Sequence, residues 1–203
     1  VHAPGLRLPE ACQLLVLHHQ LLAHGLAAAA IRETCPGVRV GIAATGRLCW
    51  PSTDSPADVE AACNATFATP DNDWAFTYQM VLAPVCFGHY PENCGPGLRR
   101  MTAALPAEDL AVIHIRPDFI GLNIYNGHAV CAGTGKRPVY VPRPRGCAVT
   151  ALKWPVTPLV MNWGVRFLWQ RYGRPIYITE NGQSCNDRIF LDGRVHDPDR
   201  IDF

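Results

Sequence analysis

The sequence has 203 residues and a formal net charge of +1, and 48% of it is hydrophobic. A chain of this length can bury a sizeable core, so we expect a globular protein. The near-neutral charge and the lack of a basic stripe argue against a nucleic-acid partner. We expect no apolar run of membrane-spanning length, so no membrane partner is expected either.

Nine cysteines are spread along the chain. Their number is odd and none form a Cys-x-x-Cys pair, which argues against a disulfide framework and a zinc site. We therefore expect mostly buried free thiols in a reducing, cytoplasmic setting, and no metal. A metal site at His18, His19 and His24 is disfavoured because these three residues do not share one helical face.

The first half of the chain predicts a long helix, a strand and then shorter helices. Apolar residues recur at helical spacing over residues 9–37, and Pro36-Gly37 ends that helix. Residues 38–45, VRVGIAAT, predict a short buried strand. Further helices are expected at residues 55–69 with Ser55 as N-cap, at 73–84, and in short pieces within 90–116.

The second half predicts two more strands with one helix between them. The first strand is expected over residues 117–127 and is ended by Asn126-Gly127. A long Pro/Gly-rich loop is expected from 128 to about 153. The helix that follows is expected to end at Gly173, and the last strand covers residues 174–182.

Apolar strands separated by helices predict an α/β fold with a parallel sheet. Three strands cannot close a barrel, and alone they leave two open edges. We therefore expect residues 1–203 to form one arc of a larger (β/α) structure.

Polar side chains stand where the predicted strands end. In a (β/α)8 barrel functional groups occupy the carboxyl ends of the strands. Thr45, Asn123, Tyr125 and Glu180 hold such positions. A carboxylate beside an amide and a phenol suits an oxocarbenium-like transition state, with the carboxylate at the anomeric carbon. Each residue alone also fits an ordinary role, as a solvated rim, a packing or a turn residue.

Several segments, in order along the chain, resemble family 1 glycoside hydrolases, the β-glucosidase family. They are VHAPG, HHQLLAHG, VGIA, SPADVEAA, GHYPE, DFIGLNIYNG, WPVTP, RYGRPIYITENG and LDGRVHDPDRIDF. The resemblance covers essentially the whole chain. It implies that residues 1–203 are a fragment of one catalytic domain. This domain would be a (β/α)8 TIM barrel, and the chain would be its C-terminal half, incomplete at both ends, with about strands five to seven present. It also implies a retaining β-glucosidase that acts on β-glucosides or oligosaccharides without a cofactor.

The resemblance also assigns roles to single residues. Glu180 matches the catalytic nucleophile, and Tyr125 matches the residue that orients it. Asn123 matches a sugar-binding amide and Trp154 a stacking wall for the leaving group or second sugar. His2 matches a residue on the outer side of the site, although an N-terminal histidine with no special role fits equally well.

Three departures accompany the resemblance. Ile124 stands where the family usually has tyrosine, which we expect to be tolerated because Tyr125 keeps the contact to the nucleophile. Thr45 stands where many members have asparagine, which leaves the leaving-group preference open.

The third departure is that the family's Asn-Glu-Pro motif, which carries the acid/base, is not in the sequence. We expect the acid/base upstream of His2 and the eighth strand beyond Phe203. The alternative is a non-catalytic carbohydrate-binding or remnant fragment. The isolated chain is expected to be inactive and to be poorly folded or homo-oligomeric.

Overall fold

The computed structural model describes residues 5–203, so the expectation for His2 lies outside the described residues. The chain forms two compact units. The first unit takes in the chain up to Ala44 and Phe67–Ile120, and the second comprises Thr45–Thr66 and Gly121–Phe203. The assignment of residues 1–203 to one catalytic domain stays a prediction.

The first unit is built mainly from helices, which are α1 (Glu10–Thr34), α3 (Tyr78–Phe87), α4 (Pro96–Ala103) and α5 (Ala107–Ile113). The predicted helix over 73–84 starts later than expected. The Thr77 hydroxyl donates to the Trp74 carbonyl at 2.8 Å and closes a turn just before α3. Side chains from all four helices share one buried core.

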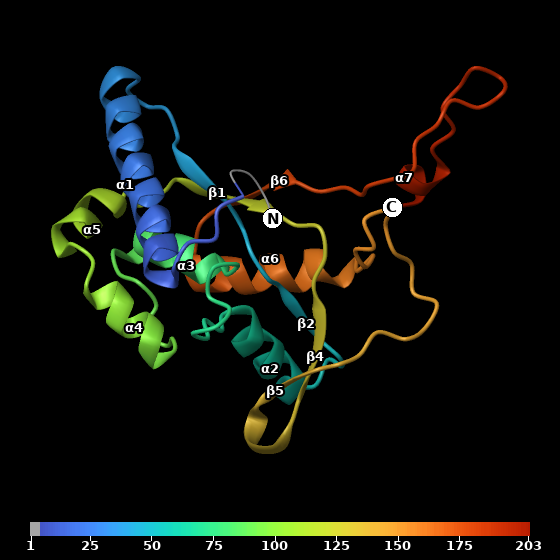
Figure 1. Ribbon diagram of the computed structural model, residues 1–203, viewed down its shortest axis with the longest axis horizontal. Coiled ribbons are helices and arrows are strands. Elements are labelled where there is room, and N and C mark those ends of the chain that lie inside the picture. The colour runs from blue at the N-terminus through green and yellow to red at the C-terminus, as the bar shows by residue number, and fades with distance from the viewer. Residues whose placement is uncertain (1–4) are drawn as a thin grey trace. The chain divides into compact units, whose positions relative to one another are not determined.

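Helix α1 packs on α5 through a stripe of buried residues, and Figure 1 shows the two helices side by side. The stripe consists of Leu14, His18, Leu21, Gly25 and Ala28, which follow helical spacing. By length and composition alone, α1 is long and apolar enough to cross a membrane. The expectation that no segment reaches that length was therefore wrong for α1, whose many alanines and leucines raise its hydropathy.

The three predicted strands are present as β1 (Gly41–Thr45), β3 (Phe119–Asn123) and β6 (Ile176–Glu180). They form one sheet in the order β1-β3-β6, which confirms the α/β character. The central strand β3 is the most buried, with Ile120 and Leu122 fully enclosed. The edge strands are less buried than predicted: only Ala44 is buried in β1, and most of β6 is exposed.

A second sheet lies in the second unit, and the sequence did not predict it. It contains β2 (Cys49–Pro51), β4 (His128–Ala132) and β5 (Pro138–Tyr140). Strands β2 and β4 pair in parallel, and β4 and β5 are antiparallel around the short 3-10 helix Thr134–Lys136. The prediction of one long loop over 128–153 was therefore wrong. These strands are short and carry no clear alternation of polar and apolar residues.

Helix α2 (Pro56–Thr66) packs on β2 and β4, next to which it is drawn in Figure 1. Ser55 caps it as predicted, since the Asp58 amide donates to the Ser55 hydroxyl at 3.2 Å. The Asp58 carboxylate also accepts from the Ala132 amide at 2.8 Å. This bond lowers the pKa of Asp58 and ties the helix start to β4.

Helix α6 (Leu159–Tyr172) leads into β6, and α7 (Pro198–Asp202) follows near the C-terminal end. Gly173 ends α6 in the left-handed conformation, with φ 60° and ψ 29°, as predicted.

The nine cysteines are all free thiols, as expected. However, only Cys49 and Cys86 are buried, so the expectation of mostly buried thiols was wrong.

Candidate active site

Two side chains meet where β3 and β6 end. The Tyr125 hydroxyl donates a hydrogen bond to Oε2 of Glu180. This bond to a carboxylate raises the pKa of the Tyr125 phenol, because ionised tyrosine would repel its acceptor. Glu180 itself is exposed, so its position at the end of an apolar strand carries no large desolvation penalty.

The backbones of the two strand ends are tied together. The Ile124 amide donates to the Glu180 carbonyl at 2.9 Å. In return, the Asn181 side-chain amide donates to the Ile124 carbonyl at 2.9 Å. The Ile124 side chain is 1% exposed and points into the core, whereas Tyr125 beside it reaches Glu180. An apolar residue at position 124 is therefore compatible with the Tyr125 contact.

Asn123 is the last residue of β3 and lies beside β6. Its Oδ1 accepts a hydrogen bond of 2.7 Å from the Thr179 hydroxyl. The Thr45 hydroxyl, at the end of β1, lies 3.5 Å from the Asn123 carbonyl oxygen. The ends of all three strands thus contribute polar groups to one small region.

Trp154 joins this region from the segment that precedes α6. Its ring meets Tyr125 edge to face, with the centroids 5.5 Å apart and the planes at 63°. Trp154 as a residue is 44% exposed, so part of its surface is open to solvent. The tryptophan thus stands next to the tyrosine that contacts Glu180, with an aromatic face available for an apolar surface.

A tight turn presents Trp154. The Thr150 amide donates to the Trp154 carbonyl at 2.8 Å, and the Lys153 amide donates to the Thr150 carbonyl at 2.8 Å. Lys153 has φ +65°, a left-handed conformation that non-glycine residues rarely adopt. The hydrogen bonds within the turn therefore help to hold Lys153 in a conformation that its local preference does not favour.

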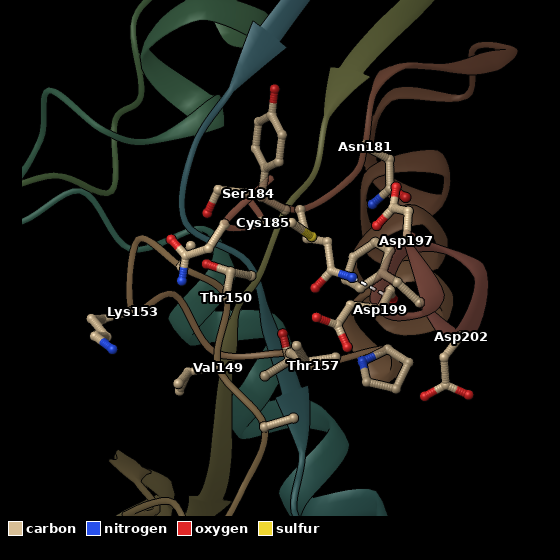
Figure 2. Close-up of a pocket in the computed structure, with 18 of the residues that line it drawn as sticks. Val149, Thr150, Lys153, Thr157, Asn181, Ser184, Cys185, Asp197, Asp199 and Asp202 are labelled. Carbon is tan, nitrogen blue, oxygen red and sulfur yellow. Dashed lines mark hydrogen bonds between the residues drawn. The ribbon is translucent and has the colours of Figure 1, made fainter. Parts of the chain in front are cut away.

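A cavity of about 620 Å³ adjoins these residues. Tyr125 and Asn181 line it together with residues 148–151, Lys153 and residues 183–187. Figure 2 shows Val149 and Lys153 on one side and Asp197, Asp199 and Asp202 on the other. The cavity could not be predicted from the sequence, because its walls come from several separate segments of the chain.

The acidic side of the cavity contains an ion-pair network. The Arg200 guanidinium donates to both carboxylate oxygens of Asp187, at 2.7 and 2.9 Å. It also contacts Asp197 at 2.7 Å. The hydrogen bonds from Arg200 lower the pKa of Asp187, and together these contacts fasten α7 to the segment after β6.

His18, one of the three histidines considered as a metal site, has hydrogen-bond partners within the first unit. His18 is fully buried, and its ring nitrogens lie 3.0 Å from the Tyr90 hydroxyl and 3.1 Å from the Asp109 carboxylate. Within residues 5–203, no group of three or more metal-ligating side chains is found. His18 therefore joins α1 to α5 as a structural residue.

Known proteins resemble the chain along its whole length. The model of glycosyl hydrolase family 1 matches residues 1–203. The chain is 31% identical to β-glucosidase A of Thermotoga maritima and 35% identical to a β-glucosidase of an Agrobacterium species. Both comparisons cover 100% of this chain but only 44% and 43% of the relatives.

A solved structure gives the same picture. The Thermotoga maritima β-glucosidase in complex with glucoimidazole superposes with a TM-score of 0.74 at 32% identity. The comparison covers 100% of this chain and 44% of that one. The chain therefore spans less than half of the length of the relatives that it resembles.

Proposed function

Because the chain belongs to glycosyl hydrolase family 1, we propose that the protein carrying it is a retaining β-glucosidase. It hydrolyses terminal, non-reducing β-D-glucosyl residues of β-glucosides or oligosaccharides. The observation that carries this proposal is the hydrogen bond from Tyr125 to Glu180 at the ends of adjacent strands. The names of the similar proteins point the same way, since they are β-glucosidases.

In the proposed reaction, a Glu180 oxygen attacks the anomeric carbon and the bond to the leaving group breaks. A second carboxyl group gives its proton to the departing oxygen. A glucosyl ester of Glu180 results. Water then attacks the same carbon, gives up a proton to the second carboxylate, and releases Glu180 as a carboxylate. Two inversions at one carbon retain the β configuration, and the reaction needs no cofactor.

Tyr125 serves Glu180 by orienting the carboxylate and by donating to it when it carries charge. Asn123 offers an amide to a sugar hydroxyl, and Trp154 offers an aromatic face to the leaving group or second sugar. His2 is assigned to the outer side of the site by resemblance alone. The edge-to-face contact between Trp154 and Tyr125 supports a shared site for these groups.

The second carboxyl group must lie about 5–5.5 Å from the nucleophile in a retaining enzyme. We place it in a part of the protein that residues 1–203 do not include. The proposal is supported by the relatives, which extend well beyond the matched region. In the same view, β1, β3 and β6 are three strands of a (β/α)8 barrel, with the site at their carboxyl ends. The nine free cysteines support a reducing, cytoplasmic location.

The test is covalent labelling of the full-length protein with 2-deoxy-2-fluoro-β-D-glucosyl fluoride. The fluorine at C2 slows both steps, and the fluoride leaving group still lets the first step proceed, so the glucosyl ester accumulates. Peptide mass analysis is expected to find the sugar on Glu180. Glu180→Gln is expected to abolish labelling, whereas Glu60→Gln on α2 is the matched control and keeps it.

A label on another residue would overturn the assignment of Glu180. Sugar binding without labelling or turnover, even with activated aryl glucosides, would favour a non-catalytic carbohydrate-binding protein or remnant instead.

A further inference from the structure

Ser184 connects the segment after β6 to the turn that presents Trp154. The Ser184 hydroxyl accepts a hydrogen bond of 2.9 Å from the Leu152 amide. Its backbone carbonyl accepts another of 2.9 Å from the Ala151 amide. One residue therefore satisfies two successive amides of the turn, one through its side chain and one through its backbone.

These two hydrogen bonds are made by the residues just before Lys153, which has an unfavourable backbone conformation. Lys153, directly after Leu152, has φ +65°, which costs roughly 1–2 kcal/mol for a non-glycine residue. Bonds from Lys153 and Trp154 to Thr150 hold the turn from within. The bonds to Ser184 tie it from outside, and losing the one from the Leu152 amide would let the backbone of Trp154 shift and change its edge contact with Tyr125.

Ser184 also follows Glu180 closely in the chain. Ser184 lies on the segment that begins at Asn181, which is itself bonded to the Ile124 carbonyl at the strand ends. Hydrogen bonds through Ser184 therefore connect the turn to the segment that directly follows β6, the strand that ends at Glu180. Ser184 is half-buried and lines the cavity beside Tyr125, and Figure 2 shows it next to Thr150.

We propose that Ser184 is a positioning residue for leaving-group selection: through the Leu152 amide it holds Trp154 at a set place beside Tyr125 and Glu180. The inference rests on the proposed β-glucosidase function. Ser184 does not act on the reacting carbon. It holds Trp154 in the position where the indole ring can contact an aryl or sugar leaving group of the bound substrate.

The experiment uses the full-length protein and two substrates that differ only in the leaving group. The nitrophenyl leaving group of 4-nitrophenyl β-D-glucoside is large enough to reach Trp154. The fluoride leaving group of β-D-glucosyl fluoride is not. Ser184→Ala removes the acceptor, Ser184→Thr keeps a hydroxyl, and Ser52→Ala replaces an exposed serine elsewhere as the matched control.

For Ser184→Ala we expect KM for the nitrophenyl substrate to rise about fivefold, the size of one net hydrogen bond, with kcat within about twofold. Both constants for the fluoride are expected to stay within about twofold of wild type. Ser184→Thr restores most of the KM, and Ser52→Ala changes nothing. Independently of activity, hydrogen exchange at the Leu152 amide is expected to accelerate in Ser184→Ala.

Three results would overturn the inference. An unchanged KM of Ser184→Ala for the nitrophenyl substrate would show that the hydrogen bond from the Leu152 amide to Ser184 does not position Trp154. An equal loss of kcat/KM with both substrates would mean that the substitution damages the site in general. Unchanged exchange at Leu152 would mean that the hydroxyl does not hold the turn. Wild-type protein that hydrolyses neither substrate would instead refute the proposed function, and the role of Ser184 in selection with it.

Discussion

Replacing Tyr125 with phenylalanine removes the hydroxyl that donates to Glu180 and leaves the ring that meets Trp154. In the proposed reaction, Glu180 loses charge when the glucosyl ester forms and regains it when water cleaves the ester. A donor to the carboxylate therefore helps most in the second step. Phenylalanine at position 125 should accordingly slow the hydrolysis of the ester more than its formation.

The expected magnitude follows from the contact. A hydrogen bond to a charged group contributes about 1.5–3 kcal/mol. We take the low end of this range, about 1.5 kcal/mol. About 1.5 kcal/mol corresponds to roughly a tenfold lower rate of ester hydrolysis.

The assay is rapid mixing with 2,4-dinitrophenyl β-D-glucoside, whose good leaving group makes the first step fast. Tyr125→Phe should show a burst of about one dinitrophenolate per site, followed by a steady rate roughly ten times below wild type. KM should fall along with kcat, because the ester accumulates. The matched control is Tyr140→Phe, which alters a phenol that is 47% exposed in β5 of the other sheet.

Wild-type kinetics for Tyr125→Phe would refute the reasoning outright. A lower kcat without a burst would also contradict it, since that result places the loss in the first step.

Two further predictions concern stability. In Gly25→Ala, the new methyl group would lie 2.8 Å from the Val112 carbonyl carbon of α5, so the free energy of unfolding should fall by about 1–3 kcal/mol. Ala29→Ser on the exposed face of α1 is the control, and equal melting temperatures for the two variants would contradict the close contact. Burial raises the pKa of Cys49 to about 11, so its contribution to stability is full below about pH 9 and is lost as the pH rises toward about 11. Between pH 8 and pH 10, denaturant titrations under reducing conditions should show wild type losing about 1 kcal/mol more than Cys49→Ala, and parallel losses would argue against the raised pKa.

Features fixed by neighbouring residues were predictable from the sequence. Ser55 caps α2 and Gly173 ends α6 because both depend on local backbone chemistry. The strands β1, β3 and β6 were found from their apolar runs, although the expected strand over 117–127 ends at Asn123. Beyond that residue the chain still pairs with β6 through the Ile124 amide, but no longer as a regular strand.

Features that depend on distant residues were not predictable. The sheet of β2, β4 and β5 depends on pairing between segments about 80 residues apart, such as Cys49 with His128. At the candidate site, the resemblance drew attention to Tyr125, Trp154 and Glu180. Ser184 was missed because a serine that accepts from a backbone amide leaves no pattern in the sequence.

The side chains of the neighbours Ile124 and Tyr125 point in opposite directions. Ile124 is buried in the core, and Tyr125 contacts Glu180. Because of this alternation, the segment from Phe119 to Tyr125 is intolerant of a change in length. Inserting or deleting a single residue there would shift every following side chain to the other face of the sheet. The phenol would then enter the apolar interior, and an aliphatic group would face the carboxylate. Homologous proteins should therefore keep the number of residues in this segment constant.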